Sequence, residues 1–378
     1  MQFINTFEHH RNNPSQSFDD YYRSLKLELS NSLKGKKLVY LDTKFWVVLR
    51  NGFNFPSQYV QEKHLLDLAI MLVESDICVF PISEDVFMEV IKQTDLKTLH
   101  RTVSLIDQLS NGVSSINHEE RIQLELLHYW YSAQGKEVYA AEDLAWTKLA
   151  YTMGSHTFEQ TNVPLQEKVL IQKAFTDQMW SISMQDMIAT IESSGGIGHI
   201  PPLFMADKIN EGKFSHQNEA KSFEQMFLHE VAGWIDVYGS ELNNMMEYMY
   251  EQQTGTKLQG SRSKTEEGKT KKLLGNTIYN LFRLNKVGKA LPSIRIMSGL
   301  YAAVRWDKLQ KFQDHDHHDF RHAATALPYC DYFFTEKRLT HLITQKKLSF
   351  DKLYGCETCS KIDRAIEILE SLAKVIKD

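Results

Sequence analysis

Short apolar runs near both ends of the chain predict buried strands. Residues 38–41 form a compact apolar run that stops at Asp42, and residues 77–80 form a second run that Pro81 closes. A third run, residues 332–335, lies close to the other end of the chain. Runs of this length, rich in β-forming residues and bounded by polar ones, are typical of strands covered on both faces. They predict a sheet built from segments far apart in the sequence.

Helical periodicity accompanies these runs. Residues 61–75 place apolar side chains on one face of a helix, and another helix is expected to begin near Phe45. Ser83 is a suitable N-cap for a helix after the second strand, because its hydroxyl can accept a bond from a free backbone N–H. Near the carboxyl end, residues 316–327 and 361–376 suit helices. Strands that alternate with helices in this way predict an α/β fold with a central parallel sheet.

The middle of the chain, residues 98–312, has a different character. It shows helical periodicity and few strand signals, with the clearest helical segments at 119–134, 164–193, 217–251 and 292–312. Its Met and aromatic residues are expected to form a helical core rather than a cofactor pocket. Residues 254–272 have the composition of a linker, and their local excess of four positive charges suits either a solvated loop or an arm that touches phosphates.

The chain is therefore expected to consist of three parts. Residues 1–35 form an N-terminal helical extension, residues 36–97 and 313–378 together form the α/β domain, and residues 98–312 form a mainly helical insertion. With 378 residues and 42% hydrophobic content, the chain is long enough to bury a large core. This length suits either two domains or one domain with a big insertion.

The overall charge excludes one class of nucleic-acid-binding protein. A formal net charge of -5 does not fit a globally basic protein, although it is compatible with a local basic groove. Four cysteines in a chain of this length do not form a disulfide framework. The first residues lack the pattern of a signal peptide, and no apolar run approaches the ~20 residues that span a bilayer. These features predict a cytoplasmic protein that does not enter the membrane.

Acidic residues gather where the predicted strands and helices meet. Asp42 follows the first strand and Glu336 follows the last, so both are expected at the carboxyl edge of the sheet, where open parallel sheets bind their ligands. Asp319 lies near the start of the helix that leads into the last strand, with Asp316 one turn earlier on the same face. Glu89 lies on the helix after the second strand. These positions predict one acidic site that both ends of the chain build together.

Several carboxylates in one place are typical of a site for a hard divalent cation. Mg²⁺ takes oxygen ligands and keeps several of its waters, and Mn²⁺ also accepts such ligands. One metal-bound water becomes a nucleophile, and the metal stabilises the leaving oxygen when a phosphodiester is displaced in line. Without a metal the carboxylates would repel one another, and some of them would be protonated. The pattern therefore predicts metal-dependent cleavage of nucleic acid.

Each acidic residue also has a purely structural interpretation. Asp42 could cap the helix that begins at Thr43, and Asp319 could be a helix-start charge that interacts with the helix dipole. Glu89 could be an ordinary exposed helix residue. Asp331 lies before its strand, at the end opposite to Glu336, and is expected to be a turn or cap residue rather than a ligand.

Three segments resemble the PIN-like nuclease family. Segment 39–46, Val-Tyr-Leu-Asp-Thr-Lys-Phe-Trp, resembles the first strand of that family with its leading acidic residue, and segment 79–89 resembles the second strand and the helix that carries its glutamate. Segment 319–339 is the most specific. It joins a D-x-x-H-A-A helix to an L-P-Y-C-D turn and a strand that ends in F-x-T and an acidic residue. The resemblance covers about residues 36–95 and 314–345.

The resemblance implies a fold and an activity. The fold would be a PIN-like three-layer α/β/α sandwich with a central parallel sheet, interrupted by the large helical insertion. The activity would be that of an endoribonuclease dependent on Mg²⁺ or Mn²⁺, whose catalytic and metal-binding residues are Asp42, Glu89, Asp319 and Glu336. Its nucleic-acid partner would usually be RNA. Because a lone metal-dependent ribonuclease is hazardous to a cell, an inhibitory or regulatory protein partner is also expected.

The sequence departs from the family pattern at two lysines. Lys337 stands where the family often has an aspartate, so Glu336 is the available substitute, with Asp316 and Asp331 as the other options for a fourth ligand. Lys44 stands where the family often has an asparagine, and it would either weaken a metal site or hold a phosphate. These departures leave an alternative function open, that of a catalytically inactive PIN-like module that binds RNA or protein.

Two other kinds of metal chemistry fit the sequence less well. The Asp- and His-rich segment 314–319 could belong to an HD-type phosphohydrolase, but that class needs further spaced His and Asp residues. His317 and His318 are expected to be solvated or to lie behind the metal ligands, and His322 is expected to orient an acidic neighbour one turn away. The C-x-x-C segment at 356–359 has no second pair, so a structural zinc site is not expected.

Overall fold

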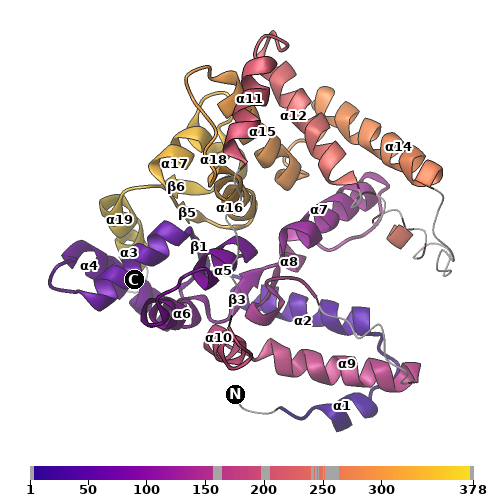
Figure 1. The fold of residues 1–378 in the computed structure, drawn as a ribbon. Coiled ribbons are helices and arrows are strands. Elements are labelled where there is room, and N and C mark those ends of the chain that lie inside the picture. Colours follow the sequence, from indigo (N-terminus) through magenta and orange to yellow (C-terminus); the bar gives the residue numbers. More distant parts are fainter. Residues whose placement is uncertain are drawn as a thin grey trace.

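Within the part of the chain that the structure describes, a four-stranded parallel sheet joins the two ends of the sequence (Figure 1). This computed structural model describes residues 4–155, 164–196, 205–239 and 264–374, with residues 242, 245, 247–249 and 251. The strand order is β2–β1–β5–β6, and the strands are β1 (Lys37–Leu41), β2 (Cys78–Val79), β5 (Tyr332–Phe334) and β6 (Glu357–Cys359). All three pairings are parallel. The expected α/β class is therefore confirmed.

Helices from both ends of the chain pack around this sheet (Figure 1). They are α3 (Thr43–Asn54), α4 (Val60–Glu74), α5 (Glu84–Ile91), α16 (Asp316–Tyr329), α17 (Lys337–Thr344), α18 (Phe350–Tyr354) and α19 (Ile362–Ala373). Two helices precede β1, namely α1 (Phe7–Arg11) and α2 (Phe18–Leu33). The predicted cap Ser83 is confirmed, because its hydroxyl accepts a bond from the backbone N–H of Val86 at 3.4 Å.

The middle of the chain is mainly helical, as expected, and the structure is 66% helical. Its helices are α6 (Leu96–Ser110), α7 (His118–Ala133), α8 (Ala141–Leu144), η1 (Leu149–Tyr151), α9 (Leu165–Trp180), α10 (Met184–Ser193), α11 (Ala206–Ser215), α12 (Phe223–Val237), α14 (Lys264–Arg283) and α15 (Pro292–Trp306). A short antiparallel pair lies among them, formed by β3 (Val113–Ser115) and β4 (Trp146–Lys148). No described helix is long and apolar enough to cross a membrane.

Two predictions from the sequence need correction, and three short strands were not predicted. The segment 164–193 is two helices, because Ser183 caps the second one by accepting a bond from the backbone N–H of Asp186 at 3.1 Å. The predicted linker 254–272 is helical from Lys264 onward, where α14 begins, and its earlier part lies outside the described residues. The sequence does not predict β3, β4 or β6, because their sequences, Val-Ser-Ser, Trp-Thr-Lys and Glu-Thr-Cys, contain no apolar run.

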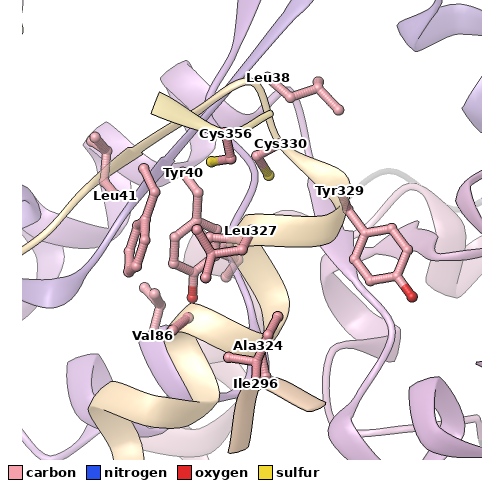
Figure 2. Packing of buried hydrophobic residues seen from close by; sticks show 14 of the residues in the cluster. Leu38, Tyr40, Leu41, Val86, Ile296, Ala324, Leu327, Tyr329, Cys330 and Cys356 are labelled. Carbon is pink, nitrogen blue, oxygen red and sulfur yellow. The ribbon is translucent and has the colours of Figure 1, made fainter. Parts of the chain in front are cut away.

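The main hydrophobic core runs from the sheet into the helical middle of the chain. Figure 2 shows a portion of it, in which Tyr40 and Leu41 of β1 lie beside side chains from several helices. Those side chains include Val86 of α5, Ile296 of α15 and Leu327 of α16, and all five residues are at most 1% exposed. Because α15 belongs to the middle of the chain, the helical insertion and the sheet share one core.

A buried polar network also links the insertion to the sheet's helices. Glu125 of α7 accepts hydrogen bonds from the backbone N–H and the hydroxyl of Ser293 on α15, at 2.9 and 2.8 Å, and from the hydroxyl of Tyr329 on α16 at 2.9 Å. Burial raises the pKa of Glu125 to about 7, although the nearby Arg121 and these hydrogen bonds act in the opposite direction. A carboxyl group that titrates near neutral pH therefore connects three helices.

Replacing Glu125 with Gln is expected to change how stability depends on pH. Between pH 4.5 and about 7 the folded protein keeps a proton on Glu125 that the unfolded chain has released, so the wild-type protein loses stability as the pH rises through this window. The Glu125→Gln variant lacks this proton, so its free energy of unfolding relative to wild type should rise by roughly 3 kcal/mol across the window.

Urea unfolding at several pH values measures this difference. Glu119→Gln, at an exposed position of the same helix, is the matched control and should follow the wild-type protein. If the Glu125→Gln and wild-type proteins showed the same pH dependence, the carboxyl group would not titrate in the folded state as described.

Candidate acidic site at the carboxyl edge of the sheet

Asp42 and Thr335 bring the two ends of the chain into direct contact. The register pairs Leu41 with Phe334, so the residues that follow β1 and β5 lie side by side. The hydroxyl of Thr335 donates to one carboxylate oxygen of Asp42 at 2.7 Å. The other oxygen accepts from the backbone N–H of Phe45 at 3.1 Å and caps α3. Asp42 is therefore both a helix cap and a carboxylate at the expected edge, and the two interpretations are compatible.

Glu89 reaches this edge from α5. One of its carboxylate oxygens accepts a hydrogen bond from the hydroxyl of Thr43, the residue after Asp42. The Nε2 atom of His322 lies 3.5 Å from the same oxygen. The Glu89 side chain is 24% exposed, so it is not an ordinary surface residue of a helix. The structure thus places Glu89 against Thr43, the neighbour of Asp42 in the chain, and against His322.

His322 lies behind the carboxylates and is 1% exposed. Its Nδ1 atom is 2.7 Å from the hydroxyl of Tyr40, which in turn is 2.6 Å from the hydroxyl of Ser83. Burial alone would lower the pKa of His322, but the carboxylates of Glu89, Asp85 and Asp42 outweigh it and raise the pKa to about 9. The imidazole therefore carries a positive charge at neutral pH among acidic groups.

The position of His322 corrects one expectation and reveals a partner that sequence reasoning missed. The sequence predicts that His322 orients an acidic residue one turn away on its own helix, but its nearest carboxylate is Glu89 on α5. Tyr40 is the missed partner. Its only signal in the sequence is a hydroxyl-bearing residue within an otherwise apolar strand, which is too weak to assign a role.

Asp319 experiences the combined charge of this edge. Burial, together with the negative charges of Glu336, Asp42 and Asp316, raises its pKa to about 7, although His322 acts in the opposite direction. Burial also raises the pKa of Asp42, and the charge of Glu336 contributes in the same direction. The charges of Asp42 and Glu336 therefore disfavour the ionised form of Asp319, and the charge of Glu336 disfavours that of Asp42.

Asp316 belongs to the same neighbourhood but already has a cationic partner. It is 2% exposed, and one of its oxygens lies 3.0 Å from Nη2 of Arg338. Among the described residues, Asp316 also forms with His315 and Asp319 a group whose potential ligand atoms all lie within 4.8 Å of one another. Since Arg338 neutralises Asp316, Asp319 is the member of this group that joins the carboxylates of the sheet edge.

The remaining acidic and basic candidates lie in different places. Asp331 lies directly before β5, at the end opposite to Glu336 as expected, and accepts a bond from the backbone N–H of Leu38 at 2.9 Å. Glu336 is half-buried at the N-cap of α17, where its side chain makes no capping bond. Lys44 and Lys337 are both exposed, so neither is inserted among the carboxylates.

A second ion-pair network lies beside the edge and was not anticipated from the sequence. Arg321 of α16 contacts Glu84 of α5 through Nη2 at 2.6 Å and Asp85 through Nε at 3.0 Å. The Nδ1 atom of His318 lies 3.3 Å from Asp85. Asp85 looks in the sequence like a simple helix-start charge, and nothing there indicates its partner on a distant helix. This network joins α5 to α16, the two helices that carry Glu89 and His322.

The other residues of the Asp- and His-rich segment point to different neighbours. Nδ1 of His317 lies 3.0 Å from the hydroxyl of Tyr301 on α15, and burial lowers the pKa of His317 to about 4. Asp314 accepts a bond from the backbone N–H of Ala206 at 3.0 Å, at the start of α11. Of the two expectations for His317 and His318, that they are solvated or that they lie behind the metal ligands, full solvation is not observed, because both are partly buried. The segment therefore mainly connects helices.

Comparisons of this chain with family models, with curated proteins and with solved structures found no match. Membership of the PIN-like family therefore stays a prediction that rests on the three sequence motifs. The geometry of the acidic edge is independent of that resemblance, because it comes from strand pairing and side-chain contacts in this chain alone.

Replacing Arg321 with Met is expected to destabilise the protein by roughly 3 kcal/mol. The change leaves Asp85, whose side chain is 4% exposed, as a buried carboxylate without its main counter-charge. Arg364→Met is the matched control, because Arg364 also pairs with a carboxylate but is 51% exposed, and exposed pairs contribute less than about 1 kcal/mol. Urea unfolding compares the two variants, and equal losses of stability would contradict the buried network.

Proposed function

We propose that this protein is a metal-dependent nuclease, and that it acts as an endoribonuclease with a PIN-like α/β/α fold. The observation that carries the proposal is the position of Asp42 at the carboxyl edge of a parallel sheet, with Glu89 bonded to the adjacent Thr43 and with Asp319 within the electrostatic influence of Asp42 and Glu336. Parallel sheets place their ligands at this edge. Carboxylate oxygens are the ligands that Mg²⁺ and Mn²⁺ prefer.

The electrostatics of the site support a bound cation. Burial and the charges of neighbouring carboxylates raise the pKa of Asp319 to about 7, and a cation bound there would offset this repulsion. A bound Mg²⁺ or Mn²⁺ would supply an activated water and stabilise the leaving oxygen of a phosphodiester. Asp42, Asp319, Glu89 and Glu336 would hold it. Thr335 positions the carboxylate of Asp42 through its hydrogen bond, and the buried His322 faces that of Glu89.

We also propose a substrate class, a cellular location and a protein partner for this activity. RNA is the proposed substrate class, and the exposed Lys44 and Lys337 flank the edge where a phosphate backbone would lie. We place the protein in the cytoplasm, and we expect a protein partner to restrain its activity. The helical insertion shares a core with the sheet, so it is a suitable platform for such a partner or for recognition of RNA shape.

A second candidate function is a catalytically inactive PIN-like module that binds RNA or protein. The observation that favours it is the engagement of Asp42, whose two oxygens already accept bonds from Thr335 and from the backbone N–H of Phe45. Lys44 and Lys337 also replace residue types that the family often has. RNA binding without cleavage would support this second function over the first.

Purified protein is expected to cut labelled single-stranded RNA in the presence of Mg²⁺ or Mn²⁺ and to stop when a chelator is added. Asp42→Asn and Asp319→Asn should each lower the rate by a factor on the order of 100 or more, because each removes a charged ligand from the site. Asp331→Asn is the matched control, since Asp331 lies at the opposite end of the strands and should leave cleavage intact.

Circular dichroism confirms that each variant is folded before its activity is read. The nuclease proposal fails if the wild-type protein cuts no better than the folded Asp42→Asn and Asp319→Asn variants across several RNA and DNA substrates.

Metal binding has its own readout. Mn²⁺ should raise the melting temperature of the wild-type protein, because a ligand that binds the folded state stabilises it by about 2.7 kcal/mol at a concentration 100 times its dissociation constant. Asp319→Asn should abolish this increase, whereas Asp331→Asn should retain it. An equal increase in all three proteins would place the Mn²⁺ away from the acidic edge.

A further inference from the structure

A cavity of about 880 Å³ lies between the N-terminal segment and α9, far from the acidic edge. Figure 1 shows α1 and α9 side by side, on the side of the molecule away from α17. Part of the wall is apolar and part is cationic, and the lining includes Phe7, Pro14, Leu170, His10, Arg11 and Lys173. A cavity of this size is typical of sites for small organic ligands.

Lys173 is the unusual residue of this wall. It is 2% exposed, and its ammonium group donates a hydrogen bond to the backbone carbonyl of Gln16 at 2.6 Å. In the part of the chain that the structure describes, no carboxylate lies within 4.0 Å of this ammonium group. Burial lowers the pKa of Lys173, and no opposing negative charge raises it. A buried cation without a counter-charge is unfavourable, so the site favours an incoming anion.

The nearest candidate for a counter-charge on the same helix is already engaged. Asp177, one turn further along α9, lies 2.7 Å from Nε2 of His10. Its oxygens also accept hydrogen bonds from the hydroxyls of Tyr21 and Thr6. These three contacts hold the carboxylate against α1 and α2, so the neighbours of the Lys173 ammonium group are the carbonyl of Gln16 and the ring of Tyr21, whose centroid lies 5.6 Å away, and neither carries a negative charge.

The other charged groups of the wall do not cancel this cation. Arg11 adds a second positive charge, although it is largely exposed and paired with Glu8. Glu167 is the acidic residue of the lining, and its exposed side chain makes no ion pair among the described residues. The obligate cations of the wall therefore exceed its carboxylates by one, with the titratable His10 in addition.

We propose that this cavity binds a small molecule that has an apolar body and one anionic group, and that the anionic group pairs with Lys173. The apolar side chains of Phe7, Pro14 and Leu170 would cover the body of the ligand. A carboxylate, sulfonate or phosphate monoester shares the chemistry that Lys173 requires. This site is separate from the proposed nuclease site, and it does not depend on that function.

The proposal is tested with two dyes that share a ring system. The sulfonate 8-anilinonaphthalene-1-sulfonate should bind the full-length protein at one saturable site and fluoresce, whereas the uncharged N-phenyl-1-naphthylamine should bind at least tenfold more weakly. Phenyl phosphate and phenylacetate, added as competitors, should displace the sulfonate, and their relative strength distinguishes a phosphate ligand from a carboxylate ligand. Equal affinity for the two dyes would overturn the proposal.

Variants of α9 locate the site. Lys173→Met should weaken binding of the sulfonate dye at least tenfold without weakening the neutral dye, and Lys173→Arg should restore it, because the charge returns. Lys168→Met is the matched control on the same helix, since Lys168 does not line the cavity, and it should bind like the wild-type protein. Unchanged affinity of a folded Lys173→Met protein would overturn the proposal.

A second variant decides the question if Lys173→Met does not fold. Leu170→Trp fills the cavity from its wall and leaves the ammonium group in place. Loss of sulfonate binding in this variant supports the proposed site, and wild-type affinity in it contradicts the proposal.

Discussion

The parallel pairing of β1 with β5 is the contact on which the acidic edge depends. Its register places the ends of the two strands together, so that Asp42 and Thr335 share a hydrogen bond although 293 positions separate them in the chain. Burial of both strands in the core offsets the entropy lost when such distant segments meet. A shift of one residue in this pairing would turn the side chains of β5 to the opposite face and part Thr335 from Asp42.

The carboxylates near this edge repel one another, and basic side chains of the surrounding helices neutralise only some of them. Arg338 neutralises Asp316, Arg321 neutralises Asp85, and the buried His322 faces Glu89. Asp319 has no arginine partner among the described residues, and burial together with the neighbouring carboxylates raises its pKa. Charges that a protein leaves uncompensated at a sheet edge are typical of positions where a ligand completes the balance. The proposed cation would supply the positive charge that Asp319 lacks.

The cavity beside α9 also contains a charge without a counter-charge, but there the charge is positive. There the uncompensated group is the ammonium of Lys173, because Asp177 is held by His10, Tyr21 and Thr6. The acidic edge and the cavity lie on different sides of the molecule. Between these two sites, the shared core and the Glu125 network connect the helical middle of the chain to the sheet. A small anionic ligand at one end and a divalent cation at the other would each supply the charge that its site lacks.

Local patterns in the amino-acid sequence were enough to predict β1, β5, the cap at Ser83 and the placement of Asp42 at a carboxyl edge, because strands, caps and helix faces depend on residues a few positions apart. Which side chains contact one another across the site could be seen only in the tertiary structure. His322 contacts Glu89 rather than its helical neighbour, and β6 forms because the edge of β5 offers it hydrogen bonds. Such contacts depend on distances between elements far apart in the sequence, and packing alone sets those distances.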